Sequence, residues 1–375
     1  MSKIMKPNII FILLDGARWD RLSVSPDFMK LTKEGTLLNN VTTAIPYTIG
    51  SINVTFSGMY GKENGIDAYY KMFKLKNSVK ILPEIFQANG YFTACDLLTD
   101  KIITSRGFNI HQAHDEYKDN LTIRHPNFIK QCLEKANEKP LFLFLYFSRT
   151  HTVTVSDVLK KYKWNDKNFY ERKNQNLKRY DDVFNEAGRY MKIILNALKE
   201  LQIYDNTIII FFSDHGTGVG ERFGERNYGS FTYEETIRTF YLFISKQIKK
   251  GQISENLRAT IDIFPTILDL AKIDNNFERP GESFAEYLLG NSSDLKEKTH
   301  TFSETGALHG PYPSPNEPNV FCIKTPQFKL MYLRTLDEWR LFDLENDPNE
   351  LNNIYDQDLS IRSKLQDRIM KWIDR

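Results

Sequence analysis

The hydrophobic residues of this chain gather in short continuous runs. Three of these runs, residues 8–14, 140–147 and 206–212, are almost wholly apolar rather than alternating. Runs of this kind are typical of strands that are buried on both faces of a sheet. Between them, in stretches such as 187–201 and 257–273, apolar residues recur at helical spacing. This alternation predicts an α/β fold with a largely parallel sheet covered by helices on both faces.

The pattern changes towards the C-terminus. A loop rich in proline and glycine, residues 306–319, precedes strand-like pieces at 328–333 and 339–344 and a helix-like stretch at 359–373. We therefore predict a large domain over residues 1–295 and a small C-terminal subdomain over residues 296–375.

Composition restricts the classes of partner. Lysine and arginine together number 50 and aspartate and glutamate 48, so the net charge of +2 favours no nucleic acid partner. Cys95, Cys132 and Cys322 lie far apart and are odd in number, which predicts structural thiols in a reducing compartment. No apolar run approaches the ~20 residues of a membrane span. We expect a soluble, cytoplasmic protein, and its oligomeric state stays open.

Polar side chains end two of the apolar runs. The first run stops at Asp15, and the run at 206–212 is followed by Ser213, Asp214 and His215. In open parallel sheets ligands bind beyond the carboxyl ends of the strands, so both runs deliver these residues to one crevice. Two carboxylates and an imidazole suit Zn²⁺ or Mn²⁺ better than Ca²⁺. Taken separately, Asp15 would serve equally well as a helix cap and residues 214–216 as a turn.

Thr48 is the candidate nucleophile. It lies between Pro46 and Gly50 in a turn that precedes a helix-like stretch. A hydroxyl at a helix N-terminus faces free backbone N–H groups, where an anionic phosphate or sulfate group binds. Coordination to a metal would make this weak nucleophile reactive. The alternative is an ordinary N-cap threonine.

At these residues the chain resembles the sulfatase and alkaline phosphatase superfamily. The segments "PNIIFILLDGARWD" and "NTIIIFFSDHGTGVGERFG" are similar to the two metal-binding strands of the family, with Asp214 and His215 on ligand positions. "RLFDLENDPNELNNI" is similar to the C-terminal subdomain of sulfatases. The resemblance implies a three-layer α/β/α sandwich, as in alkaline phosphatase, with a small C-terminal α+β subdomain.

Thr48 occupies the nucleophile position in this resemblance, ten residues before Gly58. Sulfatases carry Cys or Ser there, within C/S-x-P-x-R, for oxidation to formylglycine, whereas this chain reads "TIGSI". A threonine is similar to the phosphodiesterase and phosphotransferase branch, which acts on phosphorus. Gly16 stands where sulfatases usually have a second acid. We therefore expect one divalent metal, with Zn²⁺ or Mn²⁺ favoured and Mg²⁺ or Ca²⁺ as alternatives, held by Asp15, Thr48, Asp214 and His215.

Arg149 and His151, which follow the run at 140–147, are further candidates. His151 lies where sulfatase relatives keep a histidine that contacts the substrate or the leaving group, and it would serve as an acid and a substrate contact. Arg149 would bind the anionic group; a surface loop is the alternative role for His151. His309 is expected to be a loop residue, and the other histidines, His111, His114, His125 and His300, show no spacing that argues for ligation.

The resulting hypothesis is a hydrolase or transferase that acts on phosphate esters, either phosphodiesters or phosphonate esters, through a metal-bound threonine. One alternative is a sulfuric ester hydrolase that works without formylglycine. A second alternative is a non-catalytic binding protein on a degenerate enzyme fold. The sequence leaves the substrate, and the choice between hydrolase and transferase, open.

Overall fold

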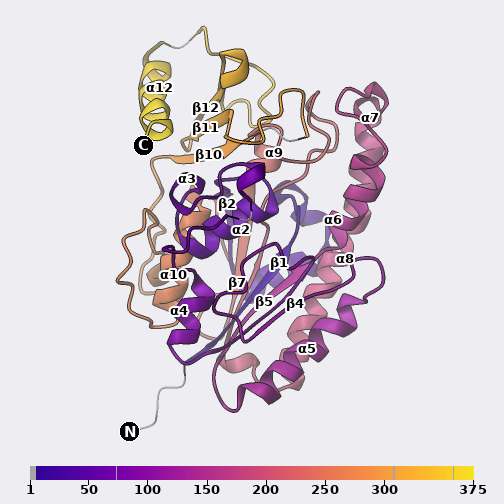
Figure 1. The fold of residues 1–375 in the computed structure, drawn as a ribbon, viewed down its shortest axis with the longest axis vertical. Coiled ribbons are helices and arrows are strands. Elements are labelled where there is room, and N and C mark those ends of the chain that lie inside the picture. Colours follow the sequence, from indigo (N-terminus) through magenta and orange to yellow (C-terminus); the bar gives the residue numbers. More distant parts are fainter. Residues whose placement is uncertain (1–5, 73, 307–308, 358) are drawn as a thin grey trace.

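The structure is a computed structural model that describes residues 6–72, 74–306, 309–357 and 359–375. Its strands form two sheets (Figure 1). The strands of the larger sheet are β1 (Asn8–Leu14), β2 (Gly35–Thr42), β3 (Phe92–Leu97), β4 (Ile110–Ala113), β5 (Leu141–Phe147), β6 (Thr207–Phe212), β7 (Arg238–Ile244), β8 (Gln252–Ser254) and β9 (Arg258–Ala259). Those of the smaller sheet are β10 (Thr301–Thr305), β11 (Val320–Lys324), β12 (Phe328–Leu333) and β13 (Glu338–Asp343).

The larger sheet is mostly parallel, as predicted. Its order is β4-β3-β5-β1-β6-β7-β2-β8, with β9 paired to β2. The five strands from β4 to β6 are parallel, whereas β7 runs antiparallel to both of its neighbours. In the register, Leu14 pairs with Phe147 and Leu13 with Phe212. The residues that follow β1, β5 and β6 therefore leave the sheet side by side at one edge.

Helices cover both faces of this sheet, which confirms the α/β sandwich. The longer helices are α2 (Thr48–Ser57), α4 (Leu82–Ala88), α5 (Leu121–Ala136), α8 (Lys173–Glu200), α10 (Ile263–Leu270) and α12 (Leu359–Ile373). The shorter α-helices are α1 (Pro26–Leu31), α3 (Gly61–Asn64), α6 (Arg149–Thr154), α7 (Lys167–Glu171), α9 (Glu234–Ile237) and α11 (Ala285–Leu289). A π-helix, η4 (Val155–Leu159), continues α6.

The predicted helix at 257–273 is wrong as a single element. Its first part forms β9 and a 3-10 turn, η6 (Thr260–Asp262), before α10 begins at Ile263. The side chains of Arg258 and Asp262 form a buried ion pair, with Nε and Oδ2 3.2 Å apart. This pair lies in a stretch where hydrophobic periodicity alone had indicated a continuous helix.

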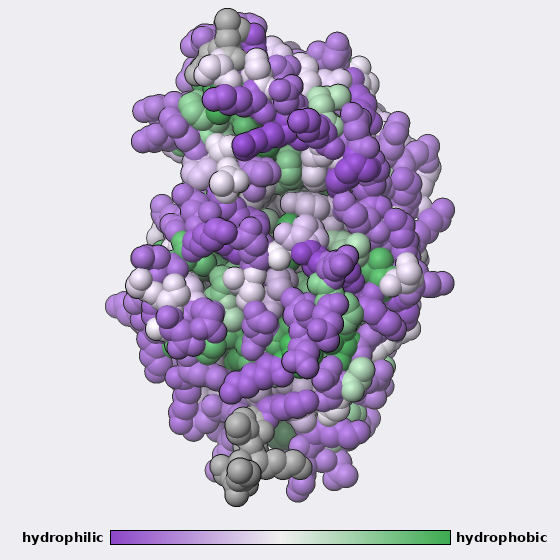
Figure 2. Space-filling view, turned by 90° about the vertical axis from the view of Figure 1, so that its left-hand side faces the viewer, coloured by the Kyte–Doolittle hydropathy of each residue, from purple (hydrophilic) through white to green (hydrophobic). Residues whose placement is uncertain are grey.

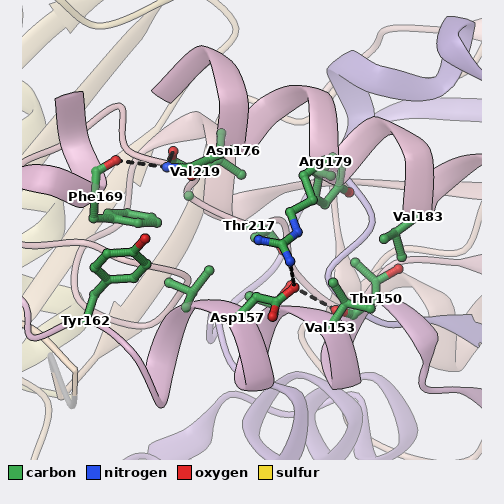
Figure 3. Close-up of a pocket in the computed structure, with 14 residues that line it drawn as sticks. Thr150, Val153, Asp157, Tyr162, Phe169, Asn176, Arg179, Val183, Thr217 and Val219 are labelled. Carbon is green, nitrogen blue, oxygen red and sulfur yellow. Dashed lines mark hydrogen bonds and ion pairs between the residues drawn. The ribbon is translucent and has the colours of Figure 1, made fainter. Parts of the chain in front are cut away.

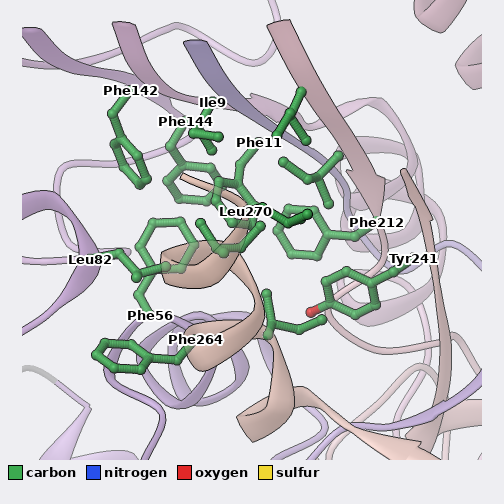
Figure 4. Packing of buried hydrophobic residues seen from close by; sticks show 14 of the residues in the cluster. Ile9, Phe11, Phe56, Leu82, Phe142, Phe144, Phe212, Tyr241, Phe264 and Leu270 are labelled. Atoms are coloured by element: carbon green, nitrogen blue, oxygen red, sulfur yellow. The ribbon is translucent and has the colours of Figure 1, made fainter. Parts of the chain in front are cut away.

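Alternate residues of β1 enter two different cores. Ile9, Phe11 and Leu13 face α2, α4 and α10, while the residues between them face α5 and α8. On the first face aromatic rings pack closely, with the centroids of Phe11 and Phe56 5.1 Å apart (Figure 4). Burial of both faces explains why β1 is a continuous apolar run.

A buried ion cluster joins the smaller sheet to the larger domain. Lys324 Nζ lies 2.7 Å from Glu234 Oε2, and Lys329 Nζ contacts both Glu234 and Glu350. Glu234 opens α9 beside the larger sheet, while both lysines belong to the antiparallel sheet of β10 to β13. The boundary near residue 295 itself stays a prediction.

One face of the molecule is mostly hydrophilic (Figure 2). Figure 2 shows hydrophobic residues on one face as scattered patches among polar ones. Within the described ranges, no helix combines the length and the apolar character that a membrane crossing requires. The three cysteines are buried and free, as predicted for structural thiols.

Candidate active site

Three predicted ligands meet at the edge where β1 and β6 end. Asp15 follows β1, and Asp214 and His215 follow β6 after one serine. His215 Nε2 lies 3.4 Å from Asp15 Oδ1 and 3.4 Å from Asp214 Oδ2. All three side chains are buried, with at most 1% of their surface exposed. The structure thus brings together residues that are about 200 positions apart in the sequence.

Thr48 joins this group from the N-terminus of α2. Its hydroxyl lies 3.4 Å from Asp15 Oδ1 and 3.3 Å from His215 Nε2. Tyr47 is extended, and Thr48 is the first residue of α2 itself, neither in a turn before the helix, as predicted, nor its N-cap. Gly50 allows the first turn to pack tightly, because a Cβ at this position would lie 2.4 Å from Ile45 Cγ2. The hydroxyl of a helix-starting residue therefore faces the carboxylates.

The donor atoms of this group fit a divalent cation. Four of the distances between them are 3.3–3.4 Å, and atoms spaced in this way lie about 2 Å from the centre of a regular tetrahedron, near the Zn–N and Zn–O bond lengths. Asp214 Oδ2 is buried and has no hydrogen-bond partner among the residues that the structure describes. His215 Nδ1 lies 2.8 Å from the Gly216 carbonyl, to which it donates, so Nε2 keeps its lone pair free for a metal.

The two carboxyl groups differ in proton affinity. Burial works against ionisation of Asp15, but the neighbouring His151, His215 and Tyr146 outweigh this effect and lower the pKa of Asp15. For Asp214, burial and the nearby negative charge of Asp15 raise the pKa despite His215. A cation would relieve this repulsion between two buried carboxylates.

His151 lies against the same carboxylate. It belongs to α6, and its Nδ1 is 2.8 Å from Asp15 Oδ2. Burial works against protonation of His151, yet Asp15 outweighs it and raises the pKa of the imidazole. His151 is therefore placed to hold a proton beside Asp15, the carboxylate whose other oxygen contacts Thr48.

Two tyrosines of the site were missed by sequence reasoning. The Tyr146 hydroxyl donates a 2.7 Å hydrogen bond to Asp15 Oδ2, and the Tyr228 ring lies 4.2 Å from the ring of His215. Tyr146 was assigned to the apolar run at 140–147 without a polar role. The alternation of side chains along β5 is the signal that could have placed its hydroxyl near Asp15.

Arg149 points elsewhere. Its Nε is 2.8 Å from Glu186 Oε2 at a half-exposed position, and the structure shows no contact of its side chain with Thr48, Asp15, Asp214 or His215. The ring of His309 lies 6.2 Å from that of Tyr228, which packs on His215. The substrate-binding role of Arg149 stays a prediction.

A small pocket borders the site on the side of α6 and α8 (Figure 3). Thr150 and Thr217 form its wall towards Gly16, and an ion pair between Asp157 Oδ2 and Arg179 Nη2, 2.6 Å long, crosses it. Its volume of about 50 Å³ holds a water or two rather than a substrate group.

Comparison with known proteins identifies the family. Residues 7–273 match the Sulfatase family model, and residues 224–375 match the family model of the N-sulphoglucosamine sulphohydrolase C-terminal region. The chain belongs to the sulfatase family. Members of this family generally bind a divalent metal, in agreement with the donor group described above.

The relatives in sequence are mostly sulfatases. The chain is 31% identical over 188 residues to an N-acetylglucosamine-6-O-sulfatase of Bacteroides thetaiotaomicron. The aligned segment covers 48% of this chain but only 32% of that protein. An arylsulfatase of Clostridium perfringens is 24% identical, with 93% of this chain and 90% of the relative covered.

Solved structures share the fold. A phosphonate monoester hydrolase of Agrobacterium radiobacter superposes with a TM-score of 0.80 at 16% identity, over 97% of this chain and 95% of the other. A protein in complex with its substrate D-glucosamine-2-N,6-O-disulfate superposes with a TM-score of 0.76 at 18% identity, over 98% of this chain and 97% of the other.

Proposed function

We propose that this protein is a metal-dependent hydrolase of sulfate esters that uses Thr48 as its nucleophile. The proposal rests on the convergence of the Thr48 hydroxyl with Asp15, Asp214 and His215 in a chain whose residues 7–273 match the sulfatase family. Because its relatives in sequence are mostly sulfatases, sulfate esters are better supported than the phosphate esters expected from the threonine alone.

The residues of the site can carry out a two-step displacement at sulfur. Thr48 Oγ1 loses its proton to solvent water and attacks sulfur, and the bond from sulfur to the ester oxygen breaks as that oxygen takes a proton from His151. Water then attacks the sulfur of the sulfo-threonine, gives a proton to His151, and releases hydrogen sulfate as Thr48 Oγ1 takes back a proton from solvent water. A divalent cation held by Asp15, Asp214, His215 and Thr48, with Zn²⁺ or Mn²⁺ favoured, would lower the pKa of the hydroxyl and offset charge on the transferred group.

The charge of the site favours a monoanionic ester. A divalent cation offsets the two carboxylates, and the protonated imidazole of His151 leaves one positive charge. Nearby arginines are engaged elsewhere: Arg18 pairs with Asp20 and Glu221, and Arg149 with Glu186. A sulfate ester carries one negative charge, whereas a phosphate monoester carries close to two at neutral pH. Sulfated sugars are candidate substrates because one relative is an N-acetylglucosamine-6-O-sulfatase.

A monoanionic phosphonate ester is the second candidate substrate. The threonine nucleophile and the structural similarity to a phosphonate monoester hydrolase favour it. The same charge argument applies, because a phosphonate monoester and a phosphodiester each carry a single negative charge.

Turnover of p-nitrophenyl sulfate and bis-p-nitrophenyl phosphate by protein reconstituted with Zn²⁺ or Mn²⁺ tests the proposal. We expect sulfate hydrolysis that is lost in Thr48→Val and retained in Thr55→Val, a buried threonine of the same helix whose hydroxyl lies 3.5 Å from Tyr241 OH. Hydrolysis of the phosphate diester alone would support the hypothesis of a phosphorus ester as the substrate. An active Thr48→Val would refute Thr48 as the nucleophile. No turnover of either ester would favour a binding protein.

A further inference from the structure

A second group of possible metal ligands lies two strands away from the active site. Asp96 belongs to β3, His114 directly follows β4, and His125 belongs to α5. The three residues each offer one ligand atom, and these atoms lie within 4.8 Å of one another. At most 5% of each residue is exposed. The two histidines showed no ligand spacing in the sequence because they lie on different elements.

His125 presents an unused nitrogen to this group. Its Nε2 is buried and has no hydrogen-bond partner within the described ranges, while Nδ1 is hydrogen-bonded to the Tyr190 hydroxyl. Burial lowers the pKa of His125 to about 3, so the ring is neutral near pH 7. An unpaired buried polar atom is costly. With Nδ1–H donating to Tyr190, the lone pair of Nε2 would be available to a metal.

The remaining atoms of the cluster are oriented by a second layer of contacts. Asp96 Oδ2 accepts hydrogen bonds from Arg124 Nε at 2.6 Å and from Gln112 Nε2 at 3.1 Å. His114 Nε2 lies 3.0 Å from Ser148 Oγ. Asp96 Oδ1 and His114 Nδ1 are hydrogen-bonded to each other over 3.1 Å, and each of these residues offers one ligand atom to the group that includes His125.

Such an arrangement is characteristic of a metal site. Ligating histidines usually make a hydrogen bond through their second ring nitrogen, and ligating carboxylates through their second oxygen. Here each of the three residues has one atom held by a contact outside the cluster, and a cation would replace the proton between Asp96 Oδ1 and His114 Nδ1. Two imidazoles and one carboxylate form a donor set that suits Zn²⁺.

We propose that Asp96, His114 and His125 bind a transition-metal ion, Zn²⁺ by preference, with water in the fourth position, at a site that is separate from the active site. Neither the family match nor the proposed hydrolysis is needed for this assignment. The ion would tie β4, the edge strand of the larger sheet, to β3 and α5. It would also hold His114 against Ser148, the residue before α6, which carries His151.

Metal content in an active-site variant tests this assignment. In Asp214→Asn, which removes an active-site ligand, we expect one equivalent of Co²⁺ to remain bound after dialysis, with the visible absorption band of a tetrahedral Co²⁺ site. The further change His125→Gln should abolish both the band and the bound equivalent. His111→Gln is the matched control, because His111 lies on β4 but contacts the Ile103 carbonyl instead of the cluster.

The outcomes separate the two sites. Loss of the band with His125→Gln and its retention with His111→Gln supports the assignment. Should His125→Gln fail to fold, the isosteric Asp96→Asn, which keeps one acceptor oxygen, is expected to weaken Co²⁺ binding at least tenfold. The assignment would be overturned by an Asp214→Asn protein that binds no Co²⁺, or by an absorption band that is unchanged in His125→Gln and Asp96→Asn. Loss of hydrolysis alone bears only on the proposed function.

Discussion

Tyr146 is expected to set the metal affinity of the active site. Its hydroxyl donates a 2.7 Å hydrogen bond to Asp15 Oδ2, and its side chain is fully buried. Tyr146→Phe removes this donor and keeps the ring that packs in the core. Asp15 would then present a less well-oriented carboxylate to the cation.

The magnitude follows from the charge of the acceptor. A hydrogen bond to a charged group contributes about 1.5–3 kcal/mol, which corresponds to about 10- to 100-fold in a dissociation constant. Comparable losses of metal affinity follow mutation of residues that support a ligand. We expect the lower end of this range, because His151 Nδ1 still lies 2.8 Å from the same oxygen.

The assay is reactivation of metal-free protein over a series of buffered free Zn²⁺ concentrations, with p-nitrophenyl sulfate hydrolysis as the readout. Tyr241→Phe is the control, because Tyr241 is equally buried on the same face of the sheet but its hydroxyl lies 3.5 Å from Thr55 Oγ1. A half-activating concentration that is unchanged in Tyr146→Phe, or raised equally in Tyr241→Phe, would refute this account of Asp15.

Three further predictions concern leaving-group protonation and stability. His151→Gln should slow hydrolysis of alkyl sulfates by about 10²- to 10⁴-fold. It should change hydrolysis of p-nitrophenyl sulfate little, because p-nitrophenolate leaves without a proton. An equal loss of rate across a series of leaving groups would contradict the role of His151 as an acid. Lys329→Met should lower the free energy of unfolding in urea by about 3 kcal/mol, because it removes the lysine from buried Glu350 and leaves the 4.0 Å contact with Arg222 as its ion pair. Lys329→Met/Glu350→Leu should recover part of the loss, and no recovery would exclude the pairing as the cause. Burial raises the pKa of Glu304 to about 8 from 4.5, so the folded protein keeps a proton that the unfolded chain releases, and stability should fall as pH rises between these values. Glu304→Gln should flatten this fall in melting temperature between about pH 5 and 8, and an unchanged slope would show that Glu304 is not its source.

The sequence predicted those elements whose hydrophobic pattern is decided by burial alone. The strands β1, β5 and β6 are buried on both faces, so their continuous apolar runs were recognisable. In α8 only the second half was predicted, because its first turns are polar and largely exposed. Periodicity also failed at 257–273, where apolar residues enter a short strand, a 3-10 turn and a helix in succession.

Site residues were predictable where a strand or a helix ends. Asp15, Asp214 and Thr48 stand at such ends, and the topology of a parallel sheet brings strand ends together. Tyr228 lies in an irregular segment between β6 and α9, and no local pattern indicates that its ring packs on His215. The pairing of His114 with His125 depends on how α5 packs against the edge of the sheet, which is a long-range property.

Gly16 bears on the proposal that the active site holds its cation with four ligands. The residue has a positive φ of 64°, and a Cβ there would lie 2.7 Å from Thr217 Oγ1, which donates a hydrogen bond to the Gly16 carbonyl. An aspartate at this position would meet both backbone strain and a clash, so the chain cannot present the second acid that sulfatases usually carry there. A cation bound as proposed would have three side chains and the Thr48 hydroxyl as its ligands. Four ligands suit Zn²⁺, whereas Ca²⁺ takes six to eight oxygens. The departure from the family pattern at Gly16 thus agrees with the one at Thr48: both favour a compact site in which the nucleophile is itself a ligand.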